Sequence, residues 1–246
     1  MKRLAALAAA TATLCLQNAH AGPADYMYLP SVEYGEREID FKFGSWKEKD
    51  QDRLSAGSVG FGYGATHNWF TEIYVKYNKV GGETTTFDAW EWENKFQLTE
   101  PGQFPVDIGL ITEIEKPKDH SEGYEFKWGP LFQTEFGKVQ LNANLLFERK
   151  YRGTSDEARN TEMGYQFQAK YRWLPQFEYG IQAFGEMGKW NKWENSGDQN
   201  HRIGPAVFGK FALGGRQVIK YNAAYLFGTT SNSPDHTFRV QTEYEF

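Results

Sequence analysis

Acidic residues at strand spacing are the first feature of this sequence that could do chemistry. Glu91 and Glu93 lie two positions apart and Lys95 follows, so on a strand all three would share one face. Two carboxylates on one face could serve as general acid and general base. The alternative is a ladder of paired charges along a polar wall. We prefer the ladder, because similar alternation of charges recurs along the chain.

Three histidines in polar segments are the second set of candidates. A histidine within hydrogen-bond reach of a serine or a carboxylate is the arrangement of a hydrolase. The histidines and their polar neighbours are His120 with Asp119 and Ser121, His201 with Asp198, and His236 with Asp235. Polar loops carry such residues without catalysis, so an enzyme is kept only as an alternative. The single cysteine, Cys15, lies in an N-terminal apolar run, and we expect no metal and no other cofactor.

Charge and composition narrow the class of protein. The net charge of -5 argues against nucleic acid as a partner, since phosphate binding requires a basic surface. The chain is polar, with a mean hydropathy of -0.67, yet 17% of its residues are aromatic. A wall with one apolar face and one wet face has this combination.

The N-terminus has the pattern of a secretory signal peptide. Lys2 and Arg3 precede an apolar run, and the run ends at Ala19-His20-Ala21, which fits a cleavage site. We therefore expect residues 1–21 to be removed, leaving a single domain at 22–246.

Alternation with period two runs through the chain from about Val32, which indicates strands with one apolar face. Ile111 and Leu146 are exceptions, since they fall on the polar sides of their runs. Gly60, Gly62 and Gly64 share an inward face, where they would leave room for bulky side chains of the opposite wall or permit sharp curvature. The expected strands are 33–46, 55–64, 69–79, 85–98, 105–115, 124–136, 139–151, 162–173, 177–188, 201–213, 217–228 and 236–246.

The connections between these strands alternate between short turns and longer polar loops, as in barrels of the outer membrane. We therefore predict an all-β fold, a transmembrane antiparallel up-and-down β-barrel of about twelve strands, rather than a soluble sandwich. Both termini would face the periplasm, with a free segment at 22–31. Trp46, Trp90, Trp190 and Trp193 would mark the outer rim.

The C-terminus resembles the last strand of bacterial outer-membrane barrels, which the barrel-assembly machinery recognises. The residues that carry this resemblance are Phe238, Val240, Thr242, Tyr244 and Phe246. The segment from Gly60 to Trp69 resembles the MetA-pathway-type outer-membrane channel family. The size also resembles the small twelve-stranded oligosaccharide porins, although those have a more basic lumen.

Together these features predict a channel in the cell outer membrane for passive diffusion of small polar or weakly cationic solutes. Acidic residues slightly outnumber basic ones on the inward face. The expected lumen-lining residues are Glu91, Glu93, Lys95, Glu113, Glu148, Lys170, Arg172, Glu186, Arg202, Lys210, Arg239 and Glu243. Outer-membrane lipids and lipopolysaccharide would surround the barrel. A barrel hydrolase and a closed structural or adhesive barrel are the alternatives.

Overall fold

The computed structural model describes residues 22–48, 51–153 and 160–246. The expected signal peptide at residues 1–21 lies outside the described residues. No helix in the described ranges is both long enough and apolar enough to cross a membrane.

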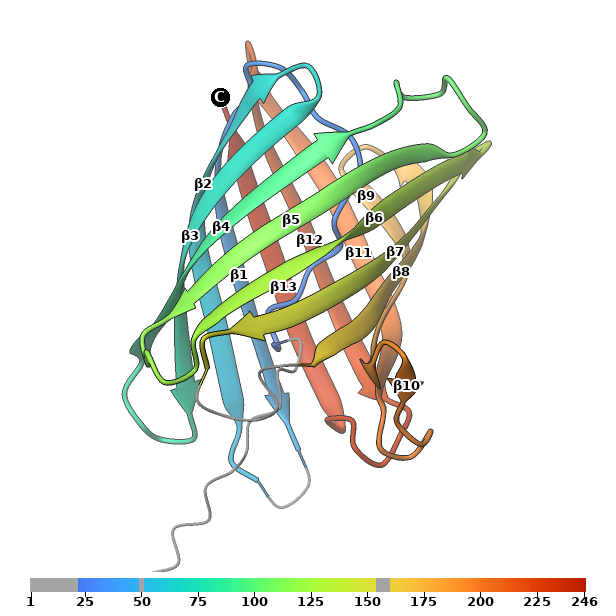
Figure 1. Ribbon diagram of the computed structural model, residues 1–246. Coiled ribbons are helices and arrows are strands. Elements are labelled where there is room, and N and C mark those ends of the chain that lie inside the picture. The colour runs from blue at the N-terminus through green and yellow to red at the C-terminus, as the bar shows by residue number, and fades with distance from the viewer. Residues whose placement is uncertain (1–21, 49–50, 154–159) are drawn as a thin grey trace, which may run out of the picture.

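The described chain forms twelve long strands and one strand of two residues (Figure 1). The bounds predicted from the sequence agree within four residues for the first strand and within two for the others. The strands are β1 (Arg37–Lys47), β2 (Leu54–Thr66), β3 (Trp69–Val80), β4 (Thr86–Gln97), β5 (Asp107–Pro117), β6 (Tyr124–Phe136), β7 (Val139–Tyr151), β8 (Thr161–Leu174), β9 (Phe177–Lys189), β10 (Lys192–Trp193), β11 (Asn200–Gly214), β12 (Gln217–Gly228) and β13 (His236–Glu245).

The sheet closes on itself. Each long strand pairs antiparallel with its sequence neighbours, and β9 pairs directly with β11 because β10 is a side hairpin on β9. The last strand then pairs with the first, from Glu38 opposite Glu245 to Lys47 opposite His236. Closure gives every long strand two partners and leaves no open edge. The predicted up-and-down barrel of twelve strands is confirmed.

Large apolar side chains point outward from the barrel. Phe41 is 51% exposed and Ile73 is 57% exposed, whereas their strand neighbours Asp40 and Glu72 are buried inside. A soluble sandwich would show the opposite arrangement, with its polar faces toward water. A barrel wall surrounded by lipid has an apolar outer face and can carry charged residues on its inner face, as observed here. Trp46 departs from the predicted rim, because its side chain is buried on the inward face.

The connections differ between the two ends of the barrel. Four connections at the end that carries the C-terminus have two residues each (Figure 1), namely 67–68, 137–138, 175–176 and 215–216. The fifth connection at this turn end is longer, at 98–106, and hydrogen bonds to Thr99 and Asp107 keep it compact. The opposite, loop end carries the longer connections, including 190–199 with β10 and 229–235.

The inward glycines of β2 make room for side chains on β3. A Cβ at Gly60 would lie 2.3 Å from the Tyr74 ring, and one at Gly62 would lie 2.4 Å from the Phe70 ring. The space at Gly60 and Gly62 is thus taken by side chains of the adjacent strand, rather than by the opposite wall as expected.

The outward apolar face predicts a cost for charge at mid-wall. Phe41→Arg should lower the free energy of unfolding in phospholipid vesicles by about 2–4 kcal/mol, since the guanidinium would face hydrocarbon. Urea titration of the protein folded into vesicles measures this change. Leu98→Arg, in the connection at the turn end, is the control and should change stability little. Equal stability of the two variants would contradict a lipid-facing wall.

Candidate functional site

The segment that precedes β1 lies inside the barrel. Residues 22–36, which we call the N-terminal plug, run through the lumen and reach the turn end before β1 begins (Figure 1). The expectation of a free periplasmic segment at 22–31 is therefore wrong. The reason is chemical, because this segment carries tyrosines and an aspartate that find partners on the charged inner wall.

Two tyrosines fix the plug to acidic residues of the wall. The Tyr28 hydroxyl donates to Glu113 Oε2 at 2.8 Å, and the Tyr26 hydroxyl donates to Glu93 Oε2. Hydrogen bonds to charged acceptors are about twice as strong as neutral ones. Glu93 and Glu113 were expected to line a pore, and here they hold the segment that fills it.

Amide side chains on the wall satisfy the backbone of the plug. Asn144 Nδ2 donates to the Tyr28 carbonyl at 2.9 Å, and Gln166 Nε2 donates to the Tyr26 carbonyl at 2.8 Å. Nearer β1, the Val32 N–H donates to Gln97 Oε1 at 2.8 Å. An extended segment has no hydrogen-bond ladder of its own, so these amides replace the strand partner that it lacks.

An apolar cluster explains the two exceptions in the sequence pattern. Ile111 and Leu146 point inward and pack with Leu131 and Tyr28 in one buried group. An apolar residue on a wet face costs free energy unless something covers it, and here the plug covers it. Apolar residues on the polar side of a strand were therefore the sequence signal for a segment inside the barrel.

Glycines on the wall let the plug approach closely. A Cβ at Gly44 would lie 1.8 Å from the Pro23 carbonyl oxygen, and one at Gly64 would lie 1.9 Å from the Glu33 carbonyl oxygen. Any larger residue at these positions would push the plug away from the wall.

Charged contacts complete the attachment. The Lys42 ammonium lies 3.2 Å from the centre of the Tyr26 ring and 3.5 Å from that of the Tyr74 ring. Arg202 Nη2 lies 3.1 Å from Asp25 Oδ2. Cation–π contacts strengthen when they are desolvated, as both of these tyrosine contacts are.

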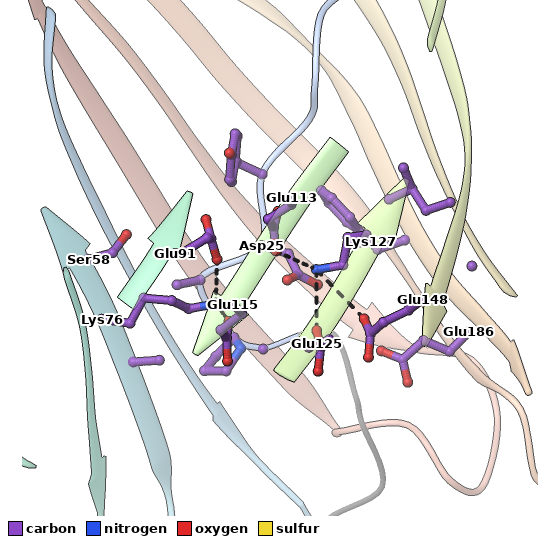
Figure 2. A pocket seen from close by; sticks show the side chains of 18 of the residues that line it. Asp25, Ser58, Lys76, Glu91, Glu113, Glu115, Glu125, Lys127, Glu148 and Glu186 are labelled. Atoms are coloured by element: carbon purple, nitrogen blue, oxygen red, sulfur yellow. Dashed lines mark hydrogen bonds and ion pairs between the residues drawn. The ribbon is translucent and has the colours of Figure 1, made fainter. Parts of the chain in front are cut away.

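A cavity of about 370 Å³ lies between the plug and the loop end, and we call it the loop-end cavity. Ten acidic and four basic residues line it. Figure 2 shows two lysines that each bridge several carboxylates. Lys76 pairs with Glu91 and Glu115, while Lys127 contacts carboxylates on β5, β6 and β7. Acids remain in excess, so the cavity has a negative potential.

A second cavity, of about 610 Å³, lies at the turn end. We call it the turn-end cavity. Its charged lining has the opposite balance, with four basic residues against Glu178 and Glu243. Met27 and Leu29 of the plug also line it, so the plug separates two compartments of opposite charge.

The twelve predicted lumen residues fall into three groups. The loop-end cavity contains Glu91, Glu113, Glu148 and Glu186. The turn-end cavity contains Lys170, Arg172, Lys210 and Glu243. The remaining four belong to neither lining; Glu93, Arg202 and Arg239 are buried, and Lys95 lies against the Phe70 ring. Residues of the plug itself, above all Tyr26, Tyr28 and Asp25, were missed.

The C-terminal residues lie where the resemblance to assembly signals requires. Phe238 is 43% exposed on the outer face of β13, and Phe246 directly follows this strand. Val240 and Tyr244 are partly exposed on β13. Their role in assembly stays a prediction.

The histidine candidates have structural contacts. The two ring nitrogens of His201 contact the Tyr165 hydroxyl and Gln199 Oε1. His236 packs against the rings of Tyr225 and Phe227. Near His120, hydrogen bonds from the Ser121 side chain and backbone lower the pKa of Asp119, in the pattern of an Asx turn. These contacts organise loops and strand ends, and none of them forms the serine–histidine pair of a hydrolase.

Comparison with known proteins gives likeness in structure but not in sequence. No protein-family profile and no curated protein matches this sequence. The COG4313 outer-membrane channel from Pseudomonas putida F1 superposes with a TM-score of 0.56 at 12% identity, over 92% of this chain and 99% of that one. The NanC porin gives 0.56 at 9% identity, over 85% and 98%.

The KdgM porin in complex with disordered oligogalacturonate gives a TM-score of 0.55 at 10% identity, over 85% of this chain and 99% of that one. At such identities the likeness concerns the fold. It confirms that this chain has the architecture of small outer-membrane porins and channels.

The close approach at Gly44 provides a test of the plug. Gly44→Val should displace residues 22–31, because the new side chain would occupy the space of the Pro23 carbonyl. In a variant that also carries Ala24→Cys, a polar maleimide should label the thiol several times faster than in Ala24→Cys alone. Gly82→Val, at a loop position with open space around it, is the control. Unchanged labelling in the Gly44 variant would show that the plug does not depend on this contact.

Proposed function

We propose that this protein is an outer-membrane channel for passive diffusion of small polar or weakly cationic solutes, with the N-terminal plug narrowing its path. The observation that carries the proposal is a closed twelve-strand barrel with a charged inner wall and a cavity at each end of the plug. Eight-stranded barrels are filled by their own side chains, whereas sixteen strands leave an open channel. Twelve strands leave a lumen that one extended segment can obstruct.

Charge sets the preference among solutes. The excess of acids in the loop-end cavity attracts cations into a confined space and repels anions. The KdgM porin was determined in complex with an oligogalacturonate, which is anionic. The acidic cavity of the present chain favours the opposite charge at this end.

The surroundings of the barrel follow from its outer wall. Apolar side chains face outer-membrane lipids, and the exposed Trp190 and Trp193 at the loop end lie where lipopolysaccharide headgroups would be. Phe246 and the outward residues of β13 support recognition by the barrel-assembly machinery. The pathway needs no cofactor and no bond-breaking step, so the proposal is transport rather than catalysis.

Conductance in planar lipid bilayers tests the channel. The wild-type protein should pass a small, cation-selective current, because the plug narrows the lumen. Replacing residues 22–31 by a glycine–serine sequence of equal length should raise the conductance severalfold. If the replaced variant is folded and passes no current at any salt concentration, the channel proposal is wrong.

Selectivity provides a separate test. Glu122→Gln combined with Glu162→Gln removes two acids from the lining of the loop-end cavity. The ratio of cation to anion permeability, measured as a reversal potential in a salt gradient, should move toward unity. Glu194→Gln, which changes an exposed acid outside this lining, is the control and should leave the ratio unchanged. An equal response of both variants would contradict a selective role for the cavity.

A further inference from the structure

Two arginines are buried where the plug meets the barrel wall. Arg202 on β11 and Arg239 on β13 are each 2% exposed, although both carry a full charge. Their guanidinium carbons lie 6.0 Å and 5.3 Å from the centre of the same ring, that of Phe184. Buried charges require partners, so the groups that neutralise this pair decide whether it is stable.

The plug supplies one of these partners. Arg202 Nη2 lies 3.1 Å from Asp25 Oδ2 and 3.9 Å from Glu186 Oε1. Arg239 donates through Nη2 to Asn222, a neutral acceptor. Its other terminal nitrogen, Nη1, is buried without a hydrogen-bond partner in the described part of the chain. Arg239 therefore has an unused donor, and its guanidinium shares the Phe184 ring with Arg202, which holds Asp25.

A wall carboxylate, Asp40, belongs to β1, which pairs with the β13 strand that carries Arg239. Asp40 Oδ2 already accepts from Tyr74 at 2.8 Å and from Gln241 at 3.0 Å, and it lies 3.3 Å from Lys42 Nζ. Asp40 belongs to the wall and is engaged there. Asp25, which pairs with Arg202, belongs to the plug and leaves the arginines whenever the plug moves away.

We propose that the Arg202–Arg239 pair is a binding site for the carboxylate group of a solute, and that Asp25 is the internal ligand that holds this site while the plug is in place. The inference rests on the proposed channel function, since the solute must enter the lumen. A planar guanidinium recognises a carboxylate by parallel hydrogen bonds, and Arg239 Nη1 offers a donor for this purpose. A solute carboxylate would replace Asp25 and lower the cost of moving the plug.

The position of the pair defines the class of solute. Asp25 and Glu186 are carboxylate partners of Arg202 and both line the loop-end cavity, so the arginine pair lies at the inner boundary of that cavity. A simple anion approaching from the loop end meets an excess of acids before it reaches the arginines. A small zwitterion presents an ammonium group to the acids and a carboxylate to the arginines. The geometry therefore favours a zwitterion over an anion or a cation alone.

The test uses planar bilayers with glycine, acetate and ethylammonium added on the loop-end side. Glycine should raise the potassium chloride conductance of the wild-type channel, and ethylammonium should not. Acetate should act less strongly than glycine. In Arg239→Gln, the glycine concentration for half the effect should rise by about tenfold, the factor that corresponds to about 1.4 kcal/mol. Asp25→Asn should conduct more than wild type without any solute, because the internal ligand is lost.

Matched variants separate binding from folding. Arg239→Lys keeps the charge and should retain part of the glycine effect. Arg152→Gln changes an exposed arginine outside both cavity linings and should retain all of it. Heat-dependent migration in gel electrophoresis verifies that each barrel is folded. A glycine effect in Arg239→Gln equal to that of wild type, or an equal effect of ethylammonium, would overturn the proposal. So would the absence of any glycine effect on wild type. Conductance by the variant in which a glycine–serine sequence replaces residues 22–31 would still support the channel function, even if the carboxylate site were disproved.

Discussion

The structure depends on one constraint: its backbone groups must form hydrogen bonds within lipid, a solvent that provides no hydrogen-bond partners. Lipid cannot satisfy an exposed N–H or carbonyl group, so each strand must have a partner on both sides. The pairing of β1 with β13, from Glu38 opposite Glu245 onward, meets this requirement. Once the sheet is closed, alternation assigns one face to lipid and the other to the lumen. The outward Phe41 and the buried Asp40 are two consequences of the same closure.

A barrel of this size then faces a problem in its interior. Its charged wall cannot fill the lumen by itself, and charges in a confined space must pair or keep water. The N-terminal plug provides partners of several kinds at once. Its tyrosine hydroxyls meet Glu93 and Glu113, its carbonyls meet Asn144 and Gln166, and a tyrosine ring covers Ile111. The plug is thus held by polar contacts together with one apolar cluster around Tyr28.

Charge segregation links the plug to transport. The plug divides the lumen into a loop-end cavity rich in acids and a turn-end cavity with more bases. The ion pair between Asp25 and Arg202 lies where the plug borders the acidic compartment. A solute that crosses therefore meets acids first, a buried arginine pair next and basic residues last. The balance of lining charge therefore changes from acidic to basic between the loop end and the turn end.

The sequence by itself determined the barrel wall. Period-two alternation and turn residues are local signals, which can be recognised without knowing which distant residues are in contact. It placed all twelve long strands. Only the tertiary structure decided what fills the barrel. Tyr28 and Glu113 are 85 positions apart, and Tyr26 and Gln166 are 140 apart, so no local pattern joins them. The sequence held one indirect signal of the plug, namely that Ile111 and Leu146 are apolar residues on otherwise polar strand faces. They are apolar because a segment from the N-terminal end of the chain covers them in the folded barrel.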